Sequence, residues 1–248
     1  MIVFYDDIQE KDGWTISAPG LWNRTPLENL KDDTLYDKWI RLNAGEQAVL
    51  YTGNIPAKID YCALGGVNFA NASIAPIIQL SNDNFSTLIG EYELAPEGNN
   101  HMIAQFDVHE ARYARLIINT SGVKSIGKIK VGLSEAMPAM SGTKKGEHVT
   151  TKKPQVSKSG QNYPSKTGYE YDAVDIPFEY LSEDEWNQLL SFYKKVLNQK
   201  CFFMRLWDSR GDLYPLMYGK FTNDKLTWDE TGSLLYPKKS KLEFSEAF

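Results

Sequence analysis

Residues 111–118 read Ala-Arg-Tyr-Ala-Arg-Leu-Ile-Ile, and this stretch decides the fold of the first half of the chain. Basic and apolar side chains are mixed over the first five positions, and three apolar residues follow. A short run rich in aromatic and β-branched residues is typical of a strand. We therefore predict a β-strand over 113–119.

Short segments of the same kind lie on both sides, and Gly, Asn, Pro or Asp separates most of them. Several short strands with turn residues between them favour a β-sandwich or jelly roll. Residues 1–38 are mixed in character and are predicted to be an N-terminal extension. The further strands predicted in this half are 39–42, 48–51, 59–64, 77–80, 101–106 and 126–131.

Four segments, taken in order, resemble a discoidin-like, galactose-binding-like sandwich: Asp60–Asn68, Gln79–Asp83, Ala111–Ile118 and Ile126–Gly132. The resemblance covers about 39–133, so we place this domain at 39–137. It implies a sandwich whose loops at one end bind ligands, often glycans, although many members of this class are purely structural.

Sugar binding needs an exposed aromatic ring with polar groups beside it. The alternative is that the phenylalanines fill the core and the Asn and Asp residues form ordinary turns. The candidate carbohydrate-binding residues are Phe69, Asn71, Asn82, Asp83, Asn84 and Phe85.

A Lys-, Gly-, Ser- and Thr-rich stretch, 138–168, divides the chain. We predict a linker at 138–149 and a second β domain at 150–248. In that domain, arms at 150–156 and 169–178 flank a polar tip, which predicts a long β-hairpin.

An amphipathic helix is predicted over 183–198, because Ser182 and Glu185 form a capping box before an apolar stripe. Strands are predicted at 201–207, 216–221 and 242–248. The fold class is therefore mainly β: an N-terminal sandwich, then a β domain with a long hairpin and one α-helix.

The order of hairpin, helix, aromatic strand and closing Leu242–Phe248 segment resembles the small distal-tail and tail-tip proteins of long-tailed phages. The resemblance covers about 146–248. It implies a tail-tube-like β domain and a ring of six or three copies, with neighbouring tail-tube, hub or tail-tip proteins as partners and DNA only as passing cargo. Six copies of a chain with net charge −5 would line such a channel with about −30.

The hairpin is the expected contact between copies, because exposed strand edges in a ring pair with the next subunit. The alternative for its lysines is a solvated linker. The candidate interface residues are Lys152, Lys153, Lys158, Lys166, Tyr169 and Tyr171.

The net charge of −5 argues against general nucleic-acid binding. We see no signal peptide and no apolar run of membrane-spanning length, so synthesis in the host cytoplasm without a membrane anchor is expected. The resemblance to phage tail proteins implies a place in the virion tail tip. Cys62 and Cys201 each sit in an apolar run and are expected to be buried free thiols.

No catalytic, metal-binding or cofactor motif is present, so we expect neither an enzyme nor a cofactor. A hydrolase stays open as an alternative, because carboxylate pairs can assemble in three dimensions. The sequence favours a structural component of a phage tail tip or baseplate that displays a carbohydrate-binding domain. The alternatives are a soluble glycan-binding module and an accessory domain of a secreted enzyme, which the missing signal peptide disfavours.

Overall fold

The computed structural model describes residues 1–18, 27–30, 39–41, 47–70, 75–97, 100–119, 124–138, 145–150, 155–156, 162–163, 170–196, 200–206, 215–223, 226, 228–230 and 238–246. The chain forms two compact units. Unit 1 contains Met1–Met137, Cys201–Leu206 and Leu213–Tyr218, and unit 2 contains Pro138–Lys200, Trp207–Asp212 and Gly219–Phe248. The described residues are mainly β, as predicted, and none of their helices is long and apolar enough to cross a membrane.

Unit 1 is built almost entirely from strands. Its elements are β1 (Ile2–Phe4), the 3-10 helix η1 (Ile8–Glu10), β2 (Trp14–Ser17), η2 (Leu27–Leu30), β3 (Trp39–Arg41), β4 (Gln47–Gly65), β5 (Ile77–Ser81), β6 (Leu88–Glu93), β7 (Ala95–Glu97), β8 (His101–Ile118), β9 (Lys124–Ile126), β10 (Lys128–Gly132), β11 (Glu135–Ala136) and β16 (Phe202–Arg205).

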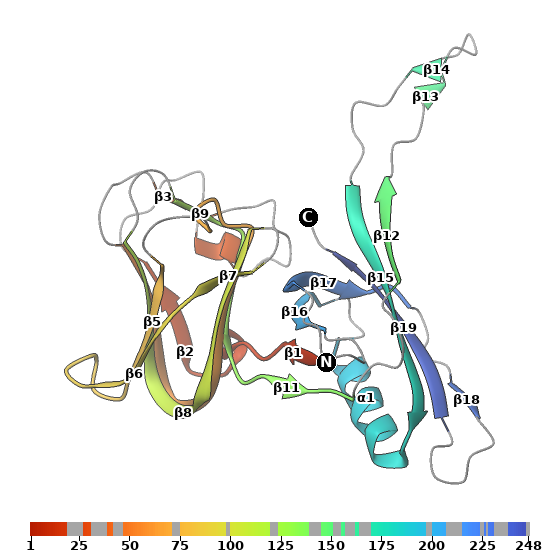
Figure 1. Cartoon of the computed structure of the whole chain (residues 1–248). Helices are drawn as coiled ribbons and strands as arrows, with labels where there is room; N and C mark the ends of the chain where they lie inside the picture. The colour runs from red at the N-terminus through yellow and green to blue at the C-terminus, as the bar shows by residue number, and fades with distance from the viewer. Residues whose placement is uncertain are drawn as a thin grey trace. The chain divides into compact units, whose positions relative to one another are not determined.

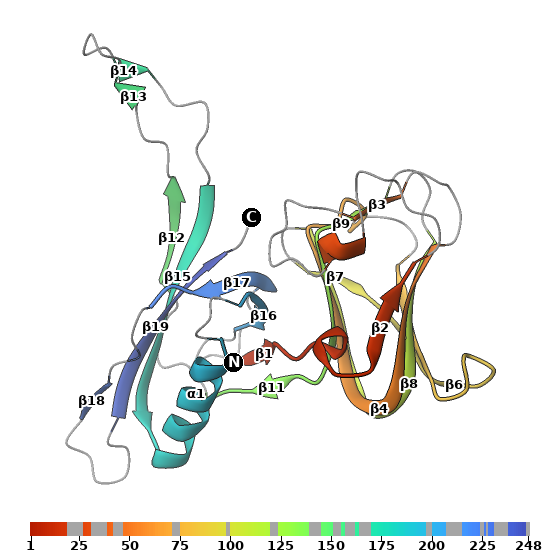
Figure 2. The ribbon, with the colours of Figure 1, turned by 180° about the vertical axis from the view of Figure 1, so that it is seen from behind.

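Two long strands, β4 and β8, organise unit 1. They pair antiparallel in two main stretches, Gln47–Thr52 and Tyr61–Leu64 of β4, with a short paired segment, Ala57–Ile59, between two register shifts; the first shift leaves residues 53–56 of β4 as a bulge. Figures 1 and 2 show the two strands bending together at one end of the unit. Beyond the bend, β2, β5 and β6 extend one stretch, and β7 and β10 extend the other. One sheet folded over itself therefore supplies both layers of the sandwich, and the bulge allows the bend.

The core lies between the two layers and follows from alternation along β8. Ala114, Leu116 and Ile118 are buried, whereas Tyr113 and Arg115 are partly exposed. Successive side chains of a strand point to opposite faces, so the predicted strand has one core face and one outer face. The strand predicted over 113–119 is confirmed as the C-terminal part of β8. Both cysteines are free and buried, as expected.

The N-terminal residues form part of unit 1, although the sequence predicted an extension up to residue 38. β1 pairs with β11 on one edge and with β16 on the other, and β2 pairs with β4. The difference arises because these strands are three or four residues long and too short for a periodic signal.

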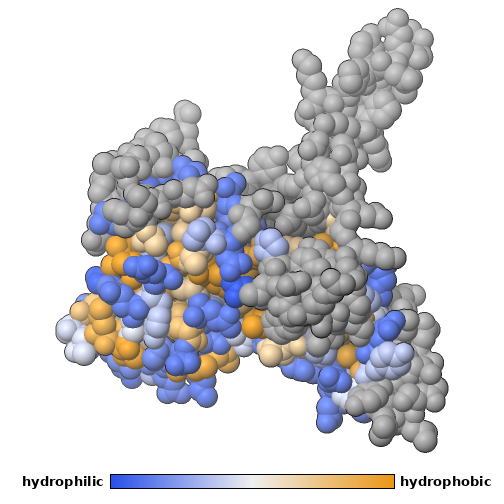
Figure 3. Space-filling model, viewed as in Figure 1, coloured by the Kyte–Doolittle hydropathy of each residue, from blue (hydrophilic) through white to orange (hydrophobic). Residues whose placement is uncertain are grey.

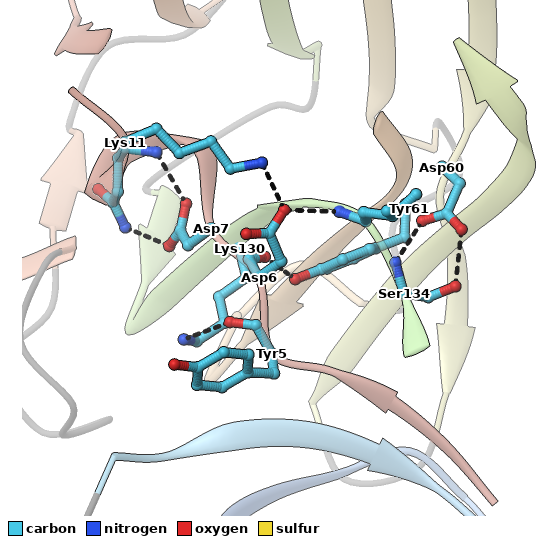
Figure 4. Close-up of polar contacts among 10 residues, drawn as sticks. Tyr5, Asp6, Asp7, Lys11, Asp60, Tyr61, Lys130 and Ser134 are labelled. Carbon is cyan, nitrogen blue, oxygen red and sulfur yellow. Dashed lines mark hydrogen bonds and ion pairs between the residues drawn. The ribbon is translucent and has the colours of Figure 1, made fainter. Parts of the chain in front are cut away.

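Polar contacts attach the segment after β1 to the sandwich (Figure 4). The Asp6 carboxylate accepts from Leu133 N at 3.2 Å and from Lys11 Nζ at 2.7 Å. The Tyr61 hydroxyl donates to the Asp6 carbonyl, and Lys130 Nζ donates to the Tyr5 carbonyl at 3.5 Å. Burial of polar groups is tolerated here because each finds a partner.

Unit 2 consists of one antiparallel sheet with a helix on one face. The sheet order is β17, β19, β15, β12, with β18 also pairing with β19. Its elements are β12 (Lys145–Thr150), β13 (Gln155–Val156), β14 (Asn162–Tyr163), β15 (Glu170–Leu181), α1 (Glu183–Val196), β18 (Trp228–Glu230) and β19 (Lys238–Glu246), and β17 (Met217–Phe221) runs from unit 1 into unit 2.

A hairpin is present in unit 2, but its first strand begins earlier than predicted: β12 covers Lys145–Thr150, which falls mostly within the predicted linker at 138–149 and not in the predicted arm at 150–156. β12 pairs antiparallel with β15 from Lys145–Asp175 to Thr150–Glu170, and β13 pairs with β14 further along the same arm. Figures 1 and 2 show β13 and β14 beyond the ends of β12 and β15, at the far end of unit 2 from α1.

The predicted helix is also present. Ser182 Oγ accepts from Glu185 N at 3.3 Å, while Ser182 N donates to the Glu185 carboxylate at 2.8 Å, which completes the capping box. The buried face of α1 comprises Trp186, Leu189, Phe192, Tyr193 and Val196. Phe192 lies 6.0 Å from the Phe221 ring, so this face packs on the sheet. Residues 197–198 of the prediction lie outside the described residues.

Candidate functional site

A cluster of polar and aromatic side chains lies on the outer face of the sandwich. Gln79 belongs to β5, Glu91 to β6, and Tyr113 and Arg115 to β8. The register pairs Gln79 with both Glu91 and Arg115, so these three side chains share one row across neighbouring strands. They point away from the core because Ile78, Leu80 and the β8 core residues occupy the inner face.

Arg115 lies at the centre of this cluster. Its guanidinium carbon is 4.3 Å from the ring centroid of Phe85, a distance typical of a cation–π contact. Its Nε and Nη2 donate to Gln79 Oε1 at 3.1 and 2.5 Å, and Gln79 Nε2 donates to the Glu91 carboxylate. The Gln79 amide thus accepts from Arg115 and donates to Glu91, and these hydrogen bonds hold the guanidinium over the Phe85 ring.

Phe85 has an unusual backbone conformation. Its φ is 64°, and φ of Asn84 before it is 55°. A bulky residue in the left-handed region is an outlier that costs free energy, about 1–3 kcal/mol. Phe85 N donates to Ser81 Oγ at 3.0 Å, and the ring lies edge-on to Tyr113 with centroids 6.0 Å apart. The β5–β6 loop therefore holds the ring, half-buried, against the outer face of the sheet.

Asp83 shapes this loop. Its Oδ1 accepts from Thr87 N at 2.9 Å and from Ser81 Oγ at 2.8 Å. The hydrogen bond from the Thr87 backbone, together with that from Ser81, lowers the pKa of the Asp83 carboxyl. The Asp83 carboxylate is exposed to solvent, and its hydrogen bonds determine the shape of the β5–β6 loop.

The six residues predicted from sequence are not one cluster. Asn82 is tied to β8, since its Oδ1 accepts from Arg112 N at 3.0 Å and its Nδ2 donates to the Glu110 carbonyl at 3.2 Å. Phe69 is 6% exposed and belongs to the hydrophobic core, which was the alternative given for it. Asn71 lies outside the described residues. Asn82, Asp83, Asn84 and Phe85 share the β5–β6 loop, and Phe85 is the one whose ring meets the Arg115 cluster.

Arg115, Gln79, Glu91 and Tyr113 were missed as site residues by the sequence reasoning. The available signal was the strand alternation at 111–118, which places Tyr113 and Arg115 on one face. That face could not be paired with Gln79 and Glu91 without the strand order.

A second group of aromatic residues lies on β6 and β8, at the margin of the hydrophobic core of unit 1. The Tyr92 and Phe106 rings stack with centroids 4.1 Å apart and planes 6° apart, and Tyr92 Oη lies 2.6 Å from His109 Nε2. All three side chains are half-buried. Because Tyr92 and Phe106 pack against the core cluster, we assign this group to closure of the sandwich.

The predicted interface residues fall mostly outside the described ranges. Lys152, Lys153, Lys158, Lys166 and Tyr169 are not described, and Tyr171 lies in β15, where its backbone pairs with Val149. Within the described residues, no three His, Cys, Asp or Glu side chains are grouped to hold a metal ion.

The outer-face cluster has the chemistry of a sugar site. A half-buried ring offers an apolar surface, and a guanidinium, an amide and a carboxylate offer donors and acceptors beside it. Such a combination fixes a polar ligand with an apolar face in one orientation.

No family model and no curated protein matches the sequence. Solved structures similar to this chain include CpGH89CBM32-6, produced by Clostridium perfringens, with 20% identity, 51% of this chain and 98% of that chain covered, and a TM-score of 0.41. A fucose-binding module of Streptococcus pneumoniae has 13% identity, 52% and 95% coverage, and a TM-score of 0.40.

A fucosidase of Ruminococcus gnavus in complex with fucose has 15% identity, 52% of this chain and 27% of that chain covered, and a TM-score of 0.42. At these identities and TM-scores, none of the three likenesses carries an inference about what this chain binds. The Streptococcus pneumoniae structure is a fucose-binding module by its own name. None of these similar structures is a phage tail protein.

Proposed function

We propose that unit 1 binds a carbohydrate on its outer face, at the cluster of Phe85, Arg115, Gln79, Glu91 and Tyr113, and that this protein is not an enzyme. The observation that carries the proposal is Phe85 itself. A strained backbone at a bulky aromatic residue, held by the loop and capped by a guanidinium, suggests a ring positioned for contact. A pyranose would pack its C–H groups on the face of the Phe85 ring that Arg115 does not cover, and would hydrogen-bond to Arg115 and Glu91.

The test is a titration of the full-length protein against a broad glycan panel, followed by calorimetry on the glycans that bind. We expect saturable binding for wild type and a loss of at least about tenfold in affinity for Phe85→Ala. Ile55→Ala is the matched control, since Ile55 is 68% exposed and lies in the β4 bulge, away from the cluster. The proposal is wrong if the wild-type protein binds none of the glycans, or if wild type and Phe85→Ala bind them with equal affinity.

Unit 2 supports a second role, in assembly. Its β12–β15 arm carries β13 and β14 at its far end, and residues 151–169 contain four lysines and no acidic residue. A long polar hairpin has no core of its own and gains order from a neighbour. We propose that copies of this chain associate through unit 2 into a ring of six or three, as a structural part of a phage tail tip or baseplate that displays unit 1.

Light scattering across a concentration series tests the ring, and we expect the mass of a trimer or hexamer. A strict monomer, alone and with neighbouring tail proteins, would favour the alternative of a soluble glycan-binding module. The place in the virion is tested separately: antibodies to the protein should label the tail end of purified particles in electron micrographs.

A further inference from the structure

The outer face of the unit 2 sheet carries a polar hollow of about 320 Å³. It is lined by Ala173, Val174 and Asp175 of β15, Lys241, Glu243 and Phe244 of β19, and Thr222 after β17. Val174 and Phe244 are buried on the side that α1 covers, whereas Asp175, Lys241 and Glu243 are partly exposed. The hollow therefore opens on the face of the sheet that faces away from the helix.

The hollow contains two carboxylates and one ammonium group. Lys241 Nζ lies 2.8 Å from Asp175 Oδ2 and 3.4 Å from Glu243 Oε1. The hydrogen bond to Asp175 raises the pKa of Lys241, so this group stays charged. One oxygen of each carboxylate has no ion-pair partner among the described residues, and the three charges leave a net charge of −1.

The backbone beneath the hollow is held in place. Thr222 N donates to the Glu243 carbonyl at 2.9 Å, and Glu243 N donates to the side-chain oxygen of Asn223. Glu243 is thus fixed by the segment that follows β17.

The lysines of the arm match this charge. Residues 151–169 carry Lys152, Lys153, Lys158 and Lys166 with no acid. The arm of the same chain leads away from its own hollow, because Asp175 lies at the base of the β12–β15 pair and Glu170 at its far end. The stretch of β15 from Glu170 to Asp175 spans roughly 17 Å. β13 and β14 lie further along the arm, away from the hollow (Figure 1).

We propose that the hollow formed by Asp175, Lys241 and Glu243 receives a lysine from the arm of a second copy of this chain. This inference rests on the proposed assembly of unit 2. The arm and the hollow are different surfaces of one chain, so the contact is head-to-tail, and repetition of such a contact closes into a ring or continues as a filament. The lysine ammonium group would donate to the free carboxylate oxygens and complete an alternating array of charges.

The first experiment compares the association of full-length wild type with the double variant Asp175→Asn/Glu243→Gln by light scattering. We expect the midpoint concentration for association to rise about tenfold or more, since interfacial charge pairs that are desolvated contribute strongly. Asp107→Asn/Glu93→Gln is the matched control, because it removes two negative charges, by the same two substitutions, from exposed sites in unit 1. Circular dichroism shows whether each variant is folded.

The second experiment keeps the test falsifiable if the double variant misfolds. Chains carrying Glu243→Cys are mixed with chains carrying Lys158→Cys and oxidised, and a disulfide between two chains is expected. Both native cysteines are buried and do not compete. Lys200→Cys replaces Lys158→Cys in the control mixture, which should not cross-link.

The outcomes separate the two proposals. A wild-type chain that stays monomeric at every concentration overturns the assembly and the docking contact together. Association that is unchanged in the double variant, without cross-links from Glu243→Cys to Lys158→Cys, overturns the docking contact and leaves assembly standing. Reduced association with specific cross-links supports both.

Discussion

The two units present outer sheet faces of opposite kinds. In unit 1, the face of β5, β6 and β8 is organised around a ring and a guanidinium, with Phe85 under Arg115. In unit 2, the face of β15 and β19 is organised around Lys241 between two carboxylates. Aromatic rings favour ligands with apolar faces, whereas paired charges favour charged partners. The difference suggests that one chain divides ligand binding and self-association between its units.

Among the residues that the structure describes, polar and apolar side chains are mixed on the surface of unit 1. In Figure 3, hydrophilic and hydrophobic residues alternate over the visible surface of unit 1. Its exposed large apolar side chains, Ile55, Leu88, Ile89 and Val108, come from three different strands. The surface is therefore better suited to selective contacts than to nonspecific association.

The largest effect is expected from a matched pair of glycine substitutions, one in each unit. A Cβ at Gly132 would overlap the Asp6 carbonyl, and a Cβ at Gly219 would overlap the Ser245 carbonyl. Backbone cannot yield as a flexible side chain can, so Gly132→Ala and Gly219→Ala should each cost about 2–3 kcal/mol of unfolding free energy. Hydrogen exchange should rise in β4 and β10 for the first variant and in β15 and β19 for the second. Equal loss of protection everywhere would show that the units do not unfold separately.

The next effect concerns pH and unit 1, where two buried groups act in opposite directions. Burial lowers the pKa of His101 to about 4, so its contribution to stability is present above pH 6.5 and lost as the pH falls toward 4. Burial raises the pKa of Asp7 to about 6, despite Lys130 and Lys128, so its contribution is present below pH 3.8 and lost as the pH rises through 6. Each contribution is on the order of 3 kcal/mol, because one pKa unit corresponds to about 1.4 kcal/mol.

The contributions of His101 and Asp7 nearly cancel in the wild-type protein, so together they should change its urea midpoint little between pH 6.5 and 4. Asp7→Asn should lose stability steeply on acidification, because His101 then acts alone. His101→Phe should gain stability on acidification, because Asp7 then acts alone; the Nδ1 atom of His101 is buried without a partner among the described residues. Parallel pH curves for all three proteins would contradict the pKa shifts.

A smaller effect sharpens the contrast between the two outer faces. Arg115→Lys keeps the charge but loses the planar fork that donates twice to Gln79. We expect glycan affinity to fall about tenfold, or about 1.4 kcal/mol, with stability changed by less than 1 kcal/mol. Calorimetry with the glycan that binds wild type measures the first and urea unfolding the second. Association through unit 2 should not change, and a change there would break the proposed division of roles.

The smallest effect is expected at the start of α1. Ser182→Ala removes the acceptor for Glu185 N and should cost about 1 kcal/mol. Ser191→Ala is the control, because Ser191 is exposed within the same helix and alanine favours helix there. Urea unfolding followed by far-UV circular dichroism compares the two. Equal midpoints would show that the cap contributes nothing to unit 2.

Short-range sequence patterns were sufficient to predict the individual strands and the helix of this protein. The alternation in 111–118 predicted a strand with one core face, and Ser182 with Glu185 predicted the start of α1, because both signals depend on neighbours within four residues. The mainly β class and the hairpin followed from the same kind of pattern.

Only the tertiary structure decided which residues meet on the outer faces. Arg115 and Gln79 are 36 positions apart, and Asp175 meets Lys241 only because β15 pairs with β19. It also decided that β1 and β2 belong to unit 1 and that Phe69 lies in the core while Phe85 does not. The cross-strand neighbours of a residue depend on strand order and register. The alternation along a single strand gives only the face on which a side chain lies, so it cannot identify those neighbours.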